Sequence, residues 1–408
     1  MTIYFIFIVL CLIFAFVFDR QDEKSKFEQF AFWSLCLYLI CLSGFSYGLG
    51  GDKFSYMQDF VELPLDISIL TYVKEQFLEQ TYMPLWSIIN YLCKEWFDSF
   101  YVVQFIESIV VNVSICYVAR KYTNHHFLFL ILFFVSEIFF QFNTEVMREG
   151  FAIAIGLIII YKYEQKQNII RYLIGVAIAL LFHLSAIILI LYPLFAKIRV
   201  VVSKKNFAIF CISVVAVWAV SDLVVTDLMP HLPIISESVK LKVLSYMGIG
   251  TTVFGFGNLF CRYIILPFIV GSYFLRYNAD DGLIHTSAKH ILLFELAIGG
   301  LICVVGFGFV RFFNYVRIIN LCWLTILVAN YFREQKHLLA RTFVILLYSL
   351  FSFLQWNTYF PDTKAHFYDL FVPYTSIVNE DSWVFEREYI YKEAIAPLEE
   401  NNAQREIK

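Results

Sequence analysis

The sequence predicts an all-α, polytopic integral membrane protein with about twelve transmembrane helices. Of its 408 residues, 60% are hydrophobic and only 16% are charged. A soluble chain usually carries about 25% charged residues, so this chain has too little polar surface for a water-soluble fold. In lipid every backbone group must be paired internally, and we therefore expect the spanning elements to be helices. The composition argues against a soluble enzyme, a secreted disulfide scaffold and a nucleic-acid binder.

Apolar runs mark the expected helices in chain order, because about 20 apolar residues are needed to cross a bilayer. The first run has no basic residue before it, unlike a cleavable signal peptide, so we expect it to remain as a span. The twelve expected spans are 2–18, 27–47, 101–119, 127–142, 147–163, 171–183, 184–197, 206–222, 258–276, 289–309, 314–332 and 340–355. The segment 81–97 is shorter and rich in Tyr and Trp, which favours a helix lying in the membrane interface on the outer side.

The distribution of Lys and Arg sets the expected orientation. With the N-terminus outside, the cytoplasmic loops hold 17 of the 26 Lys and Arg residues in 1–354. This arrangement predicts one transmembrane domain over 1–355, two long outer loops at 48–100 and 223–257, and an acidic outer tail at 356–408. Long loops in compact proteins often carry function, so the outer face is the expected working side.

Arg148 and His183 interrupt the apolar pattern at two positions. Arg148 stands in QFNTEVMREGFAIAIGL, where one expected span ends and the next begins, with Glu145 and Glu149 as neighbours. His183 lies in RYLIGVAIALLFHLSAIILILYP, which is almost uncharged. Ionisable groups at membrane depth are costly and tend to be functional. The simpler alternatives are an interfacial arginine that snorkels to water and a single hydrogen-bonded histidine at a helix junction.

Arg311, Tyr315 and Arg317 form a third candidate group, in GFGFVRFFNYVRIINLCWL. Arg311 and Tyr315 are four residues apart and should share a helix face. Arg317 is six residues from Arg311, so the two side chains diverge by about a third of a turn on a regular helix. We expect them to converge only if the helix begins between them. Otherwise they anchor helix ends at the interface.

Asp52 and Tyr56 form a fourth candidate group, in SYGLGGDKFSYMQDF just after the second span. The glycines permit a tight turn there. Asp52 either caps the helix that follows or offers a carboxylate to a site, and the sequence leaves both readings open.

The outer arginines point to an anionic ligand, because a guanidinium fork matches phosphate oxygens. A lipid pyrophosphate would suit them. The chain has no Walker-type glycine loop, no HExxH, no CxxC among its nine cysteines and no paired His/Asp set. We therefore expect no metal and no cofactor.

These pieces together resemble the EpsG family of bacterial membrane proteins, which is related to the Wzy-type polymerases of O-antigen and capsule. The matching stretches are GGDKFSYMQDF, NTEVMREGFAIAIGLIIIYKY, LLFHLSAIILILYPLF and GFVRFFNYVRIINL, within 45–330. The family often has Arg-Gln where this chain has Arg148-Glu149. The resemblance implies a multi-span fold like the related O-antigen ligases (GT-C-like) and metal-independent chemistry. By matching residues, it implies a site containing Arg148, His183, Arg311 and Arg317.

The resemblance further implies that undecaprenyl-diphosphate-linked repeat units are polymerised at the outer face of the bacterial inner membrane. The product is O-antigen, capsule or exopolysaccharide, and the expected partners are the lipid-linked oligosaccharide, membrane lipid and a chain-length regulator. In such an inverting glycosyl transfer, arginines stabilise the departing pyrophosphate. His183, Asp52 or Glu145 could serve as the base, and Tyr56, Glu145, Tyr315, Arg311 and Arg317 are expected to bind substrate.

Two alternatives belong to other classes. A flippase for the lipid-linked unit would show internal repeats and broken helices at mid-membrane, and no clear repeat is visible in the sequence. A membrane-bound acyltransferase would suit a histidine in an apolar stretch, but that chemistry does not need several outer arginines. A non-catalytic scaffold is the remaining alternative.

Overall fold

The computed structural model describes residues 2–19, 25–79, 81–198, 202–220, 253–277, 282–306, 309–331, 338–360, 365–377 and 383–390. These ranges are mostly helical, as the sequence predicts. The α-helices are α1 (Thr2–Phe18), α2 (Lys26–Gly44), α3 (Asp52–Val61), α4 (Ile69–Leu78), α5 (Pro84–Phe97), α6 (Phe100–Tyr122), α7 (His126–Val135), α8 (Ile138–Phe140), α9 (Met147–Lys166), α10 (Ile169–Leu180), α11 (Tyr192–Phe195), α12 (Lys204–Ala219), α15 (Val253–Phe260), α16 (Leu266–Tyr277), α17 (Gly282–Val305), α18 (Val310–Ala329), α19 (Leu338–Trp356) and α20 (Trp383–Ile390). The same ranges contain the π-helices η1 (Gln141–Glu145) and η5 (Cys261–Ile265), the 3₁₀-helices η2 (Leu184–Leu191) and η7 (Phe367–Leu370), and an antiparallel pair of strands, β1 (Tyr359–Phe360) and β2 (Ala365–His366).

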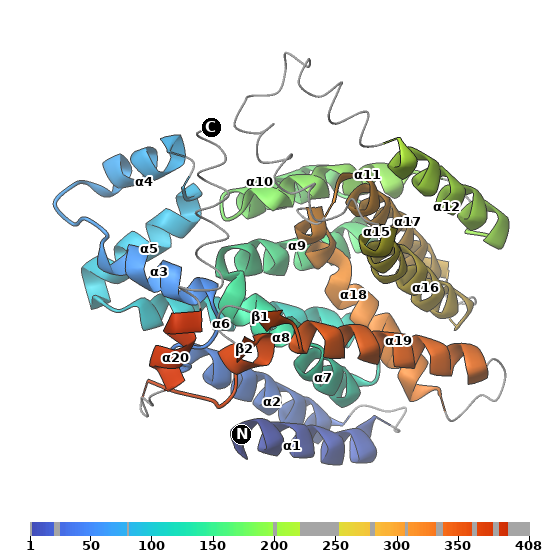
Figure 1. Cartoon of the computed structure of the whole chain (residues 1–408), viewed down its shortest axis with the longest axis horizontal. Coiled ribbons are helices and arrows are strands. Elements are labelled where there is room, and N and C mark those ends of the chain that lie inside the picture. Colours follow the sequence, from blue (N-terminus) through green and yellow to red (C-terminus); the bar gives the residue numbers. More distant parts are fainter. Residues whose placement is uncertain are drawn as a thin grey trace.

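Helix α18 lies at the centre of the bundle (Figure 1). Its side chains are buried on nearly all sides, with Tyr315 and Trp323 fully buried. A helix that is apolar around its whole circumference belongs inside a bundle. It packs against α6, α7, α9, α16 and α17. Gly156 allows the close approach of α9, because a Cβ atom there would lie 2.8 Å from the Tyr315 ring.

Five described helical segments are long and apolar enough to cross a membrane. They are Lys26–Gly44, Phe100–Tyr122, Gly255–Tyr277, Ile284–Val305 and Val310–Ala329. The bent pair His126–Val135 and Ile138–Glu145 makes a sixth if it counts as one span. The described residues therefore do not confirm the expectation of about twelve spans.

Two expected spans, 171–183 and 184–197, are not single long helices. The first is α10, whose 12 residues rise only about 18 Å, against a hydrocarbon core of about 30 Å. The second begins as the 3₁₀-helix η2 and ends as the four-residue α11. A hydropathy window counts apolar residues but does not detect where a helix stops. Here α10 ends at Leu180, and a turn leads through His183 into η2.

The expected span 127–142 is also interrupted. Helices α7 and α8 meet at 78°, and Glu137 stands at the break with φ 63°. A positive φ is uncommon for a residue other than glycine. The chain therefore turns sharply at a buried carboxylate, in a stretch that reads in sequence as one apolar helix.

Contacts define two ends of the bundle. At one end the Tyr4 hydroxyl donates to the Phe371 carbonyl oxygen (2.8 Å), and the backbone N–H of Tyr47 donates to the carbonyl oxygen of Thr375 (3.0 Å). This end of the bundle therefore holds three segments: the start of the chain, the start of the region 48–100 and the described part of the tail. At the other end Asp19 accepts from the first N–H groups of α7. In the predicted orientation, the first of these ends faces outward.

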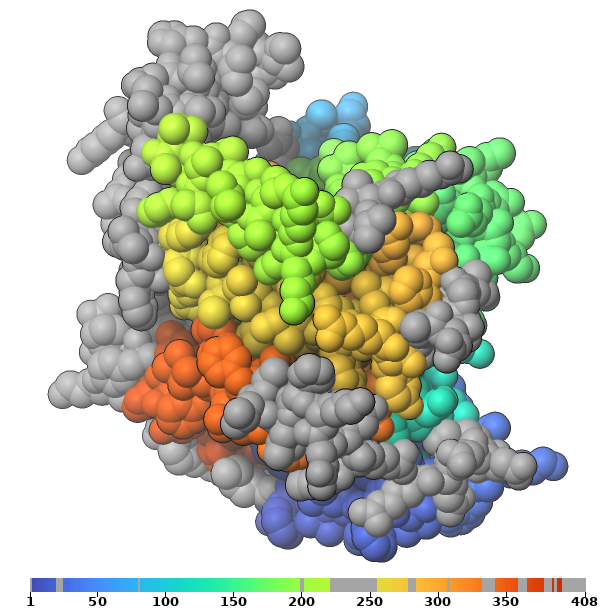
Figure 2. Space-filling model, turned by 90° about the vertical axis from the view of Figure 1, so that its right-hand side faces the viewer, coloured from blue at the N-terminus to red at the C-terminus, as the bar shows by residue number. Residues whose placement is uncertain are grey.

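The region 48–100 folds into three helices, α3, α4 and α5, which gather with α20 at the left-hand end of Figure 1. The helix expected at 81–97 is α5, which begins at Pro84. Most of the second outer loop, 223–257, lies outside the described residues. Figure 2 shows the opposite end of the bundle, where α12 lies over α16 and α17.

Candidate active site

A glycine turn places α3 at the end of the bundle that also holds Tyr4 and the described part of the tail. Gly48 and Gly50 adopt φ 55° and 87°, values that favour glycine. Both carboxylate oxygens of Glu145 accept backbone hydrogen bonds at the start of α3, from Gly51 (2.7 Å) and Asp52 (3.2 Å). A carboxylate is well placed at a helix N-terminus, because the first N–H groups lack helical partners. Glu145 therefore positions α3.

The capping reading of Asp52 is wrong. The N-cap residue of α3 is Gly51, and Asp52 is the first residue inside the helix. Asp52 and Tyr56 are four residues apart, so both lie on one face of α3. The charge of Asp52 acts on the Tyr56 hydroxyl, and so do the charges of Arg148 and Arg311. This face of α3 thus looks toward the arginines.

Arg148, at the start of α9, lies between Tyr56 of α3 and Tyr82, which stands in the segment between α4 and α5. Its guanidinium carbon is 5.4 Å from the Tyr56 ring centroid and 4.7 Å from that of Tyr82. Such cation–π contacts hold a guanidinium group in place, and Nη1 also donates to the Thr81 carbonyl oxygen (3.0 Å). Burial raises the pKa of Tyr56, and Arg148 opposes that rise. Arg148 is therefore held among protein side chains, unlike a snorkelling arginine.

His183 lies in the turn between α10 and η2. Its neighbour Phe182 stacks on Phe151 (4.7 Å between ring centroids), which follows Arg148 by three residues in α9. The His183 Nδ1 accepts from the backbone N–H of Ser185 (3.3 Å) and lies 2.6 Å from Ser185 Oγ. Burial, with smaller contributions from Arg311 and Arg148, lowers the pKa of His183 to about 3. The neutral ring therefore carries its proton on Nε2, which makes that nitrogen a hydrogen-bond donor.

Helix α18 contributes the remaining side chains of this site. Ser185 Oγ lies 2.9 Å from the Tyr315 hydroxyl, and Asn314 Nδ2 donates to Glu149 Oε1 (3.2 Å). Arg311 is exposed in the first turn of α18, and its charge acts on His183 and Glu149. We call the set Asp52, Tyr56, Arg148, Glu149, His183, Ser185, Arg311 and Tyr315 the outer cluster.

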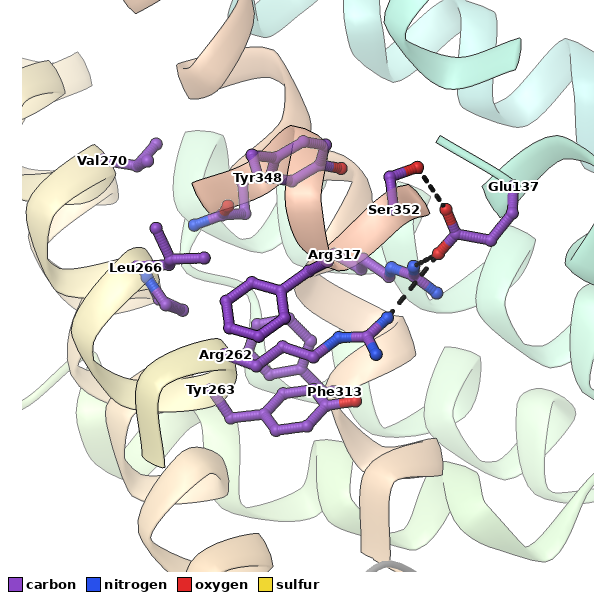
Figure 3. Close-up of a pocket in the computed structure, with 12 residues that line it drawn as sticks. Glu137, Arg262, Tyr263, Leu266, Val270, Phe313, Arg317, Tyr348 and Ser352 are labelled. Carbon is purple, nitrogen blue, oxygen red and sulfur yellow. Dashed lines mark hydrogen bonds and ion pairs between the residues drawn. The ribbon is translucent and has the colours of Figure 1, made fainter. Parts of the chain in front are cut away.

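Arg317 does not join Arg311, contrary to the expectation of one arginine site. Helix α18 runs unbroken from Val310, so no helix start separates the two residues. Arg317 forms an ion pair with Glu137 and donates to Gln141 Oε1 (2.5 Å), on another face of α18 (Figure 3). Gly306 and Gly308 precede Arg311 in the sequence and indicate a break there. The chain does break at Gly306 (φ 113°), where α17 has ended, but this point lies before both arginines.

Within the ranges that the structure describes, no three His, Cys, Asp or Glu side chains gather as a metal site would require. The fixed positive groups of the outer cluster are Arg148 and Arg311. Its carboxylates are Asp52 and Glu149, and Glu149 is buried against Asn314.

A model of the EpsG family matches residues 29–376, which contain the whole outer cluster. The chain belongs to the EpsG family. This match confirms the resemblance seen in the sequence. No curated protein and no solved structure matches the chain significantly. Membership of the EpsG family suggests a function of the polysaccharide-polymerase type, and with the apolar helices it supports a membrane protein of polysaccharide biosynthesis.

The EpsG-family chain contains further polar residues that sequence reasoning passed over. Asn314 precedes Tyr315 in a stretch that was examined only for its arginines. Glu137 is the one carboxylate in the expected span 127–142, and an ionisable residue within such a stretch is a signal in itself. Arg262 lies within the expected span 258–276, and its guanidinium group is 3.6 Å from the Glu137 carboxylate.

Proposed function

We propose that this EpsG-family protein is a polysaccharide polymerase. It joins undecaprenyl-diphosphate-linked oligosaccharide repeat units at the outer face of the bacterial inner membrane, for O-antigen, capsule or exopolysaccharide. The observation that supports this most is the convergence of Arg148, His183 and Arg311 from three separate segments. They meet at the end of the bundle that α3 and α5 cover.

The proposed reaction is an inverting glycosyl transfer. A hydroxyl oxygen of the acceptor unit forms a bond to the anomeric carbon of the donor glycan. The bond from that carbon to the diphosphate oxygen breaks, and undecaprenyl diphosphate leaves with the electron pair. Arg148 and Arg311 stabilise the negative charge that grows on the departing diphosphate, the kind of electrostatic effect that is usually the largest in catalysis.

His183 acts in this scheme as a hydrogen-bond donor. Its low pKa makes it a weak base at neutral pH, where catalysis by proton abstraction favours a pKa near the working pH. Its Nε2–H can donate to a diphosphate or sugar oxygen, while Ser185 fixes the ring through Nδ1. A donor held in advance costs little reorganisation when the charge develops.

Asp52 is the proposed base for the acceptor hydroxyl. Of the three groups that the sequence left open, Glu145 uses both oxygens on the backbone of α3, and His183 is a weak base. Asp52 is half-buried at the start of α3, on the face that carries Tyr56. The proton of the attacking hydroxyl would pass to its carboxylate.

A flippase is the second candidate, because α7 and α8 meet at a sharp break and α10 is short. Transporters often bind substrate at broken helices. The location of the lipid-linked material in a deletion strain separates the two functions. If the protein is a polymerase, single repeat units should accumulate on the outer leaflet of the deletion strain. Units trapped on the inner leaflet would indicate a flippase instead.

A further inference from the structure

A second polar pocket lies on the face of α18 that carries Arg317. The carboxylate of Glu137 receives two guanidinium groups, from Arg317 and from Arg262 at 3.6 Å, and Ser352 Oγ donates to it at 3.0 Å (Figure 3). Glu137 is almost completely buried, at 3% exposure, whereas both arginine side chains keep some exposure. Two cations thus share one anion, and this group of side chains carries a net positive charge.

The backbone around this pocket is irregular on two sides. Glu137 adopts a left-handed conformation at the break between α7 and α8, which costs on the order of 1–3 kcal/mol for such a residue. Arg262 lies in the π-helix η5, and Gln141, which binds Arg317, begins the π-helix η1. Strained residues and single π-turns cluster at functional sites. The irregular backbone therefore points to a role other than simple packing.

We propose that this pocket is a second diphosphate site, which holds the headgroup of a second lipid-linked substrate. The inference rests on the proposed polymerase function, because joining two lipid-linked units requires two diphosphate groups to be bound at once. The outer cluster would hold the diphosphate of the donor. The pair Arg262 and Arg317 would hold that of the acceptor.

The carboxylate of Glu137 occupies the place that phosphate oxygens would take between the two guanidinium groups. Arginine forks bind carboxylate and phosphate with the same geometry. A diphosphate carries more charge than one carboxylate, so it would displace Glu137 from Arg262 and Arg317. Apolar side chains, including those of Leu266, Val270 and Phe351, also line the pocket, which suits the hydrocarbon next to a lipid headgroup.

The helix keeps the two proposed sites apart. Arg311 and Arg317 are separated by six residues of α18, about 9 Å along the axis and about a third of a turn around it. Two like-charged headgroups would therefore contact different faces of one helix. Their glycans could still meet above its outer end, where Arg311 lies.

The test counts bound lipid diphosphates. Purified full-length protein in phosphatidylcholine nanodiscs is titrated with undecaprenyl diphosphate, and native mass spectrometry reports the bound equivalents. Wild type should bind two. Glu137→Gln should still bind two, with one of them about tenfold tighter, because the two arginines lose their internal anion. Changing Glu137, Arg262 and Arg317 together to Gln leaves no unpaired charge and should abolish one equivalent.

Glu164→Gln is the matched control. Glu164 is another buried carboxylate, held by Tyr192 (2.6 Å) and His290 (3.2 Å), and its substitution should leave both equivalents unchanged. Inorganic pyrophosphate, titrated separately, should bind this pocket more weakly than the lipid. Equal binding would overturn a lipid site in favour of one for free diphosphate.

If wild type binds a single equivalent and Glu137→Gln does not change its affinity, Glu137, Arg262 and Arg317 form only a structural ion pair. The proposal of a second diphosphate site would then be wrong. That result leaves the polymerase reaction untouched. Conversely, if two equivalents bind but a polymerisation assay shows no glycan elongation, the second diphosphate site is supported and the polymerase function is contradicted. The two failures are therefore distinguishable.

Discussion

The hydroxyl group of Ser185 lies 2.9 Å from that of Tyr315, a residue 130 positions further along the chain. This contact joins the turn that carries His183 to the helix that carries Arg311. Because Ser185 also contacts His183 Nδ1, the orientation of the imidazole depends on α18. Two parts of the outer cluster that lie far apart in the sequence are thereby held in one arrangement.

Substitution of His183 tests its role as a donor. His183→Gln keeps an N–H donor and should retain activity within about tenfold of wild type, whereas His183→Ala should lose about 100-fold or more, as for one donor of an oxyanion hole. The measurement is the initial rate of glycan elongation by purified variants. An inactive Gln variant with normal expression would instead assign proton transfer to His183.

Arg148 should need its guanidinium shape as well as its charge. Lys at this position keeps the charge but loses the planar fork and its stacking between Tyr56 and Tyr82. We expect Arg148→Lys to lose about tenfold or more in elongation rate, and Arg148→Ala about 100- to 1,000-fold. Arg171→Lys, an exposed change at the far end of α10, is the control and should be silent. Full activity of Arg148→Ala would exclude Arg148 from the mechanism.

The N-terminal turn of α3 should not tolerate a side chain at Gly50. A Cβ atom there would lie 2.8 Å from Glu145 Oε1 and 2.9 Å from Thr144, at φ 87°. Gly50→Ala should therefore destabilise the protein by roughly 1–3 kcal/mol and reduce elongation, since Glu145 positions α3. Gly257→Ala, where a Cβ would meet nothing within 4 Å, serves as control in a thermal-shift assay. Equal melting temperatures for the two variants would contradict this role of the turn.

Lys53 predicts a pH dependence of stability. It is fully buried in α3, with Nζ donating to Ser46 Oγ (2.9 Å), and burial lowers its pKa from 10.5 to about 7 despite the charges of Glu107 and Glu145. Between these two pKa values the unfolded chain binds more protons than the folded one, so the Lys53 contribution makes stability rise with pH across that window.

Replacing Lys53 with Met should remove this contribution. The difference in melting temperature between wild type and Lys53→Met should therefore change between pH 7 and pH 9 in favour of wild type. Lys74→Met, an exposed change in α4, should keep the pH slope of wild type. Parallel slopes for wild type and Lys53→Met would show that the Lys53 pKa is not lowered by folding.

The sequence predicted the helical membrane class because apolar residues fill long runs, and composition does not depend on how the helices pack. The resemblance to the EpsG family implied one site containing Arg148, His183, Arg311 and Arg317, and the structure brings the first three together but places Arg317 beside Glu137. That α10 stops at Leu180 and leaves His183 in a turn was not predictable, because the residues on both sides of it are equally apolar.

Other features depend on contacts that a sequence pattern does not show. The separation of Arg317 from Arg311 follows from where α18 begins, and Gly306 and Gly308 marked a break without fixing whether Arg311 fell inside the new helix. The carboxylate of Glu145 was expected to act as a base or to bind substrate. Instead it accepts hydrogen bonds from two backbone N–H groups, which belong to residues over 90 positions away in the sequence. In the sequence Glu137 is a single charge within an apolar run. Only the structure shows that it pairs with Arg262 and Arg317.

The most direct test of the central claim is polymerisation by the purified protein. Proteoliposomes containing only this chain receive an undecaprenyl-diphosphate-linked repeat unit from the same pathway. We expect a ladder of lengthened glycans, with one undecaprenyl diphosphate released for each new linkage, and no ladder from a variant that combines Arg148→Ala with Arg311→Ala. Unchanged single units with wild-type protein that binds the substrate, or an equal ladder from the double variant, would contradict it.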